Sequence, residues 1–192
     1  MSFTPIKTVN GQVIEGTGNV NVAGNYAQII QSATITGLAE ASIVATGVGA
    51  GVGSLSIPAN AFQVGDSFHA KIGGVINGSN NNDELIVRIK AGATILATTG
   101  VIILDQTTNN GWECELDFTI QSIGTGGVGN GIICTNGNFA YTKNVDKKVQ
   151  GNVFQDVQSI NTTIANTLDI TMELDNNNTN MYSANFVLYR TF

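Results

Sequence analysis

Charged side chains are scarce in this sequence. They make up 11% of the 192 residues, whereas about 25% is usual for a globular domain. Fourteen Asp and Glu outnumber eight Lys and Arg, so the net charge is −6 and the few cations are scattered. Binding nucleic acid through its phosphates needs a basic patch, so no nucleic-acid partner is expected. Asn, Thr, Ser and Gly replace the missing charge, which predicts a neutral polar surface lying against copies of the chain or a neighbour.

Histidine and cysteine are scarcer still. His69 is the single histidine, and Cys114 and Cys134 are the two cysteines. One histidine and two cysteines are too few for a zinc site, and a Ser–His–Asp or Cys–His catalytic group would have to use His69. We therefore expect no cofactor, no metal and no enzymatic activity, with His69 on the outer face of its strand. The thiols are expected to be free and buried, unless their Cα atoms lie within about 7 Å for a disulfide.

Long apolar runs are also missing. The longest, residues 101–104, is only strand-sized, so no transmembrane helix is expected. Residues 1–5 lack the basic start of a signal peptide. An acidic chain is not attracted to an anionic membrane surface. We expect synthesis in a reducing cytosol without a signal peptide, and no insertion into a membrane.

Apolar and polar residues alternate over several segments, as in antiparallel strands with one buried face. In residues 113–120 the apolar positions are Cys114, Leu116, Phe118 and Ile120. Similar alternation occurs over residues 67–75, 84–91, 167–175 and 182–189. Turn-forming clusters separate the segments at residues 73–74, 77–83, 107–111, 124–131 and 176–180. Roughly eight to ten strands at this spacing predict an all-β fold, an antiparallel β-sandwich.

The chain is predicted to have two parts. Residues 1–30 contain β-prone pieces around turns at Asn10-Gly11 and residues 16–19, which predicts a short hairpin or extended segment. This piece is too small for a core of its own, so it must dock on another structure. Residues 31–192 are predicted to form the β-sandwich. Within them, glycine-rich residues 47–53 are expected to be a flexible connection, because they lack the ending of a phosphate-binding loop.

Acidic residues on the polar face of residues 113–120 are candidates for catalytic groups. Glu113, Glu115 and Asp117 lie ~7 Å apart along a strand, within the ~5–9.5 Å range of glycosidase pairs. Any strand with outward acidic residues has this spacing, so we interpret them as a solvated face. Residues 80–84 could supply some oxygen ligands for Ca²⁺, although the spacing of an EF-hand is absent.

Trp112 is the candidate for a glycan contact, because an aromatic ring can pack on the apolar C–H groups of a sugar. The alternative is a tryptophan at the edge of the core. The Asn-rich turns at residues 77–83 and 176–180 could exchange hydrogen bonds with sugar hydroxyls.

Residues 6–22 have a specific spacing of Gly and Asn between hydrophobic positions. The pattern comprises Ile6, Lys7, Thr8, Asn10, Gly11, Ile14, Gly16, Gly18, Asn19, Val20 and Val22. It resembles a short segment that recurs in bacteriophage tail-fibre and related virion proteins. Residues 53–62, 64–68, 166–171 and 186–188 also resemble parts of a viral β-sandwich module.

The resemblance implies a virion protein, commonly trimeric, with a jelly-roll-like domain on a fibre, spike or capsid surface. Its N-terminal segment would attach to other virion proteins while the β-domain projects or binds. Lacking a coiled-coil or repetitive shaft, the chain is expected to be a short spike, head fibre or decoration protein. The expected attachment residues are Ile6, Thr8, Val9, Asn10, Gly11, Gly16, Gly18, Val20 and Val22.

Three functions follow from these observations. The first is a virion structural protein that self-associates, as a homotrimer, and displays its β-domain on the particle surface. Residues 149–164, polar with interspersed valines, could serve at its interface. The second is a carbohydrate- or receptor-binding module for host attachment. The third and weakest is a surface-polysaccharide hydrolase, which loss of activity in Glu115→Gln or Asp117→Asn would support.

Overall fold

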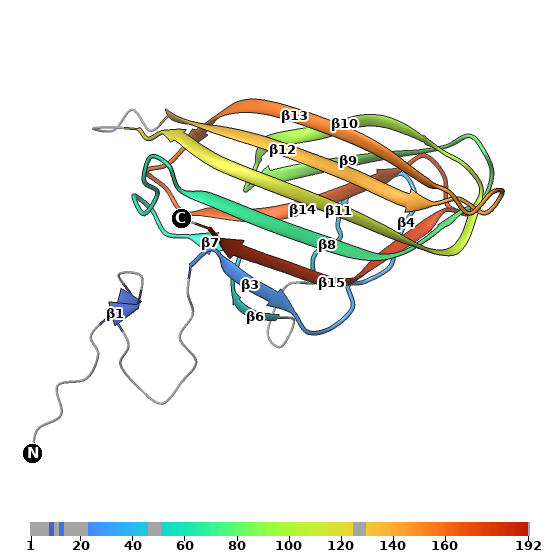
Figure 1. Cartoon of the computed structure of the whole chain (residues 1–192), viewed down its shortest axis with the longest axis horizontal. Helices are drawn as coiled ribbons and strands as arrows, with labels where there is room; N and C mark the ends of the chain where they lie inside the picture. Colours follow the sequence, from blue (N-terminus) through green and yellow to red (C-terminus); the bar gives the residue numbers. More distant parts are fainter. Residues whose placement is uncertain (1–7, 10–11, 14–22, 46–50, 125–129, 192) are drawn as a thin grey trace, which may run out of the picture.

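The computed structural model describes residues 8–9, 12–13, 23–45, 51–124 and 130–191 (Figure 1). All regular elements within these residues are β-strands, and they contain no helix that could cross a membrane. The named strands pair antiparallel in every sheet. Two sheets pack face to face, so the prediction of an antiparallel β-sandwich is confirmed.

The larger sheet has eight strands. In spatial order, seven of them are β13 (Val149–Asn161), β12 (Asn130–Thr142), β11 (Thr107–Ser122), β8 (Ser67–Gly78), β15 (Asn180–Arg190), β3 (Asn25–Gln28) and β6 (Gly51–Ser54). The short strand β4 (Ile35–Thr36) also pairs with β15.

The smaller sheet has five strands. Four follow the order β10 (Thr94–Leu104), β9 (Asp83–Ala91), β14 (Asn166–Leu174) and β5 (Ala41–Ser42), and β7 (Ser56–Ile57) pairs with β14. A separate two-stranded sheet is formed by β1 (Thr8–Val9) and β2 (Gln12–Val13).

The core lies between the two large sheets, where alternate residues of each strand meet. Ile72, Leu116 and Phe186 of the larger sheet are completely buried, as are Val87 and Ile170 of the smaller sheet. Each such side chain contributes ~1.5–3 kcal/mol by leaving water. The alternation predicted for residues 113–120 is confirmed, because the even-numbered residues are buried and most odd-numbered ones are exposed.

The turn predicted at Gly73-Gly74 is wrong, because both residues lie inside β8. A Cβ on Gly74 would lie 1.9 Å from the carbonyl oxygen of Tyr182 on β15, and one on Gly73 would lie 2.9 Å from that of Trp112 on β11. These glycines therefore allow close approach of neighbouring strands, and they do not reverse the chain.

The turn predicted at residues 107–111 is also wrong, because these residues begin β11. The pairing of β11 with β8 shifts between Thr107 and Asn110, and Asn109 has a φ of 50°. Turn-prone residues here form a bulge, which places an extra residue in one strand without reversing the chain.

The sandwich begins earlier than residue 31, the start predicted from the sequence. Strand β3 pairs with both β15 and β6, and Tyr26 in β3 is buried in the core. Residues 51–53 of the glycine-rich stretch belong to β6 and are not merely a connection. The short strands β3 and β6 form only by pairing with the sheet, a long-range contact that local sequence does not reveal.

The predicted N-terminal hairpin is represented by β1 and β2, which pair antiparallel with Thr8 opposite Val13 and Val9 opposite Gln12. Two residues separate these strands, as the Asn-Gly turn requires. The remaining expected attachment residues, Ile6, Asn10, Gly11, Gly16, Gly18, Val20 and Val22, lie outside the described residues.

Candidate functional site

At one edge of the sandwich, β13 of the larger sheet lies beside β10 of the smaller sheet (Figure 1). The side-chain amide of Asn152 donates from Nδ2 to the carbonyl oxygen of Thr99 at 3.2 Å. Gln150 donates from Nε2 to the carbonyl oxygen of Ile103 at 3.4 Å. These bonds occupy backbone acceptors of an edge strand, which would otherwise be open to pairing with another chain.

The outward row of β13 carries three strongly exposed valines, separated by Gly151 and Gln155. Val149, Val153 and Val157 are 68%, 80% and 53% exposed, because alternate residues share a face and this row points away from the core. Phe154, on the opposite row, is buried. On neighbouring β12, Ile132 is 40% exposed. We call Ile132, Val149, Val153 and Val157 the β13 flank.

The outward row of β10 has the same character on the other face of the sandwich. Ile95, Val101 and Ile103 are 41%, 53% and 49% exposed, while Ile102 and Leu104 point into the core. A strand that is apolar on both faces is normally covered on both faces. We call Ile95, Val101 and Ile103 the β10 flank.

Charge is nearly absent from the strands that carry the two flanks. β10, β12 and β13 have 11, 13 and 13 residues, and Asp156 is the one charged residue in them. Asp156 lies on the row of Phe154, away from the β13 flank, and accepts a hydrogen bond from Gln158 at 2.9 Å. Exposed apolar surface of this kind is typical of sites of protein contact.

The middle of the larger sheet's outer face is polar. His69 Nδ1 lies 2.9 Å from Asp117 Oδ1, and His69 Nε2 lies 3.3 Å from Glu115 Oε1. Lys71 lies 3.1 Å from Glu113, and this hydrogen bond, with the charges of Glu113 and Glu115, raises the pKa of the lysine. Each predicted outward carboxylate thus contacts a side chain of β8 across the strand, as on a solvated sheet face. His69 lies on the outer face, as the sequence predicted.

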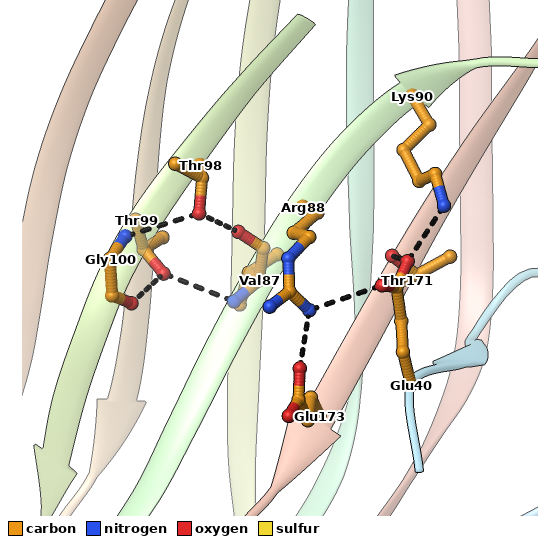
Figure 2. A network of polar contacts seen from close by, with 9 residues as sticks. All are labelled: Glu40, Val87, Arg88, Lys90, Thr98, Thr99, Gly100, Thr171 and Glu173. Atoms are coloured by element: carbon orange, nitrogen blue, oxygen red, sulfur yellow. Dashed lines mark hydrogen bonds and ion pairs between the residues drawn. The ribbon is translucent and has the colours of Figure 1, made fainter. Parts of the chain in front are cut away.

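A second polar network lies on the smaller sheet. Figure 2 shows the guanidinium of Arg88 close to Glu173 and Glu40, with Lys90 also reaching Glu40. Arg88 Nη1 is 2.7 Å from Glu173 Oε2 and 3.3 Å from Glu40 Oε2, without hydrogen-bond geometry, so these contacts are ionic. Lys90 and Thr171 donate to Glu40 at 2.8 and 2.6 Å, and the pKa of Glu40 is lowered chiefly by the bond from Lys90. The network fastens the segment before β5 to the sheet.

Asp83, at the start of β9, is a buried carboxylate that joins two loops. It accepts hydrogen bonds from Ser79 and Asn80 on one side and from Asn176 and Thr179 on the other. Burial alone would raise its pKa, but the hydrogen bonds from Thr179, Asn80 and Ser79 outweigh burial and lower the pKa. The carboxylate considered as a Ca²⁺ ligand is therefore held by protein donors. No group of three His, Cys, Asp or Glu in the described residues could hold a metal.

Trp112 does not provide a glycan contact. The ring is 3% exposed and stacks on Phe139 with centroids 5.9 Å apart. Its Nε1 donates to the carbonyl oxygen of Tyr182 at 3.1 Å. Trp112 belongs to the inward row of β11, with Cys114, so the alternative of a core tryptophan is the correct one.

Both cysteines are free. Cys114 is buried, and burial raises the pKa of its thiol to about 12. Cys134 is only partly buried and lies opposite Val157, so the prediction that both thiols are buried is wrong for it. The two residues occupy opposite rows of their sheet, which places their side chains on different faces.

The β13 and β10 flanks are the candidate functional site. The prediction of an interface at residues 149–164 included the valines of the β13 flank, whereas the β10 flank was missed. Its signal was the uninterrupted apolar run at residues 101–104, which indicates a strand apolar on both faces. No protein-family model matches this chain, and no curated protein matches it.

Proposed function

We propose that this chain is a virion structural protein, a short fibre, spike or capsid decoration protein, that self-associates and displays its β-sandwich on the particle surface. The observation that carries the proposal is the exposed, uncharged edge formed by β10 and β13. Val153 is 80% exposed there. Burying such a side chain would stabilise a complex by ~1.5–3 kcal/mol, so the edge favours association.

We also propose that the sandwich is a jelly roll, a fold used by viral capsid and lectin domains. Support comes from the strand orders β3-β15-β8-β11 and β5-β14-β9-β10 in the two sheets. If only these eight strands are followed, leaving out the short strands β4, β6 and β7, the chain changes sheet from β3 to β5, β5 to β8 and β8 to β9. It changes sheet again from β10 to β11, and, after β12 and β13, to β14 and then to β15. Strands β12 and β13 would extend the first sheet beyond this frame. Because one fold serves many functions, the virion role does not rest on it.

The N-terminal segment is proposed to attach the sandwich to other virion proteins. Strands β1 and β2 pair only with each other among the described strands, and two strands of two residues are too few for independent stability. The segment therefore needs a surface to dock on, and a neighbouring virion protein would provide it.

Light scattering on the purified chain tests self-association. The expected mass is three times 20.0 kDa, because the resemblance to fibre proteins implies a homotrimer. A variant lacking residues 1–22 retains β3 and should still form a trimer, with three times the mass of its own shortened chain, if the sandwich makes the contact. A mass of 20.0 kDa for the full chain at all concentrations would overturn the proposal.

Mass spectrometry of purified particles of the virus that encodes the chain tests its place on the virion. Absence of the chain from the particles would overturn that part of the proposal.

Carbohydrate or receptor binding is a second candidate, favoured by Tyr189. Its side chain is 44% exposed on β15, and its ring lies 5.1 Å from that of His69, which contacts Asp117. An exposed ring beside hydrogen-bonding side chains suits the apolar and polar parts of a sugar. A glycan array should then show binding that Tyr189→Ala abolishes, whereas the absence of any bound glycan would remove this candidate.

A further inference from the structure

We propose that copies of this chain assemble head to tail, with the β13 flank of one copy packed on the β10 flank of the next, so that the contacts close a ring. The inference rests on the self-association proposed above and names the surfaces that make it. Each flank consists of exposed apolar side chains, with Val153 at 80% and Val101 at 53% exposed. Both flanks border the same edge of the sandwich but lie on the outer faces of different sheets.

The position of the flanks favours a ring over a two-fold dimer. In a two-fold dimer the same patch meets itself, so a contact between two β13 flanks would leave both β10 flanks in water. In a head-to-tail ring, every copy uses both flanks and no apolar row remains exposed. Packing of the β13 flank on the β10 flank therefore gives a single kind of contact, which is repeated around the ring.

The size of the flanks points the same way. At ~3.4 Å per residue and ~4.8 Å between strands, the outer face of β12 and β13 measures roughly 44 by 10 Å, or roughly 400 Å². A specific interface buries ~800 Å² on each partner, so one such contact alone would be weak. A copy within a ring makes two contacts, and both must break before the copy leaves, so ring closure strengthens an assembly of small contacts.

The absence of charge on the flanks allows another copy of this chain to be the occupant. Two chains that each carry a net charge of −6 repel, and they approach most easily through surfaces without charge. The outward rows of β10, β12 and β13 are such surfaces. A basic partner would instead be drawn to Glu113, Glu115 and Asp117, which lie on β11 rather than on the flanks.

The contact uses side chains and does not extend a sheet. Asn152 and Gln150 of β13 already donate to the carbonyl oxygens of Thr99 and Ile103 on β10. A strand added at this edge would have to displace both amides. The valine and isoleucine rows remain free to pack face to face.

Single lysine substitutions test the surfaces. Val153→Lys on β13 and Val101→Lys on β10 place a charge in each flank, and the exposure of both side chains means that each variant should fold. Each is expected to lower the light-scattering mass about threefold, to that of one chain. Val64→Lys is the matched control, because Val64 is 63% exposed in a turn outside β10, β12 and β13, and it should keep the full mass. All three variants lower the net negative charge equally, so general repulsion cannot explain a difference.

Mixing the two variants tests the head-to-tail direction. Labelled Val153→Lys protein retains an intact β10 flank, and unlabelled Val101→Lys protein retains an intact β13 flank. Their mixture should shift NMR amide signals of β10 in the labelled protein while those of β13 stay in place. Shifts in β13, or no shift in β10, would overturn the head-to-tail contact. If the unmodified chain is a single copy, the proposed function fails as well; if it assembles and both lysine variants assemble too, only this inference fails.

Discussion

Asn152 on β13 donates from its side-chain Nδ2 to the carbonyl oxygen of Thr99 on β10, at 3.2 Å, and so joins the outer strands of two different sheets. The same Thr99 accepts at its hydroxyl from the backbone N–H of Val87 on β9, at 3.0 Å (Figure 2). Two open sheet edges thus hold each other in place. This arrangement protects the backbone at the edge while leaving the outward apolar rows exposed.

Replacing Asn152 with Ala should destabilise the sandwich by about 1 kcal/mol, the usual value of one partly buried hydrogen bond. Urea unfolding followed by tryptophan fluorescence would measure the change. Ser159→Ala, at an exposed position of the same strand, serves as the control and should change stability by less than about 0.5 kcal/mol. Equal effects of the two substitutions would show that the Asn152 bond contributes nothing to stability.

Asp83→Asn should cost about 3 kcal/mol, because the amide loses the charge that receives the donors of both loops. The folded-state pKa of Asp83 is lowered. The ionised carboxylate therefore stabilises the fold fully at a pH above the usual aspartate pKa of about 3.9, and this stabilisation is lost as the pH falls toward the folded-state pKa. The variant should therefore show a weaker loss of stability below about pH 4 in urea unfolding. Glu84→Gln, at an exposed neighbouring position, is the control and should retain the acid dependence.

Gly74→Ala should destabilise the fold by about 3 kcal/mol or more, because the added Cβ would lie 1.9 Å from the backbone oxygen of Tyr182. Gly111→Ala is the matched control, since a Cβ at that position of β11 meets no atom within 4 Å. The control should be neutral or slightly stabilising. Thermal unfolding of the two variants would compare them, and a well-folded Gly74→Ala protein would contradict the close strand approach.

Ala91→Val should stabilise the protein by about 1 kcal/mol, because two added methyl groups would occupy apolar space. Ala91 borders an apolar cavity of about 40 Å³ that is also lined by Phe62, Phe118 and Leu188. Ala70→Val, in a fully buried position that does not border the cavity, should instead lose about 1–3 kcal/mol by overpacking. A destabilising Ala91→Val would show that the cavity cannot accept the larger side chain.

Prediction from the sequence succeeded where the signal was local. The alternation of residues 113–120 correctly separated the buried Leu116 from the exposed Glu115, because neighbouring residues of a strand must point to opposite faces. It failed where a residue type served a distant partner. Gly74 indicated a turn by composition, yet it is required by the approach of Tyr182, more than a hundred positions along the chain.

The candidate site was only partly predictable for the same reason. The valines of residues 149–164 were recognised as a surface for contact, but their pattern could not reveal how exposed they are. That depends on β13 being the last strand of its sheet and on β10 being its neighbour across the sandwich. Trp112 was misplaced as a candidate for glycan contact because a turn was predicted where the strand in fact begins.

From the sequence alone it could be predicted that the chain forms antiparallel strands, which side of a strand such as β11 is apolar, and that charged residues are scarce. These properties follow from residue type and from the two-residue period of a strand. The sequence could not show which strands lie at an edge, or that Thr179 and Asn176 contact Asp83 from more than ninety positions away. Strand order depends on long-range pairing, whose free energy is shared among many weak contacts and is not encoded in any one segment.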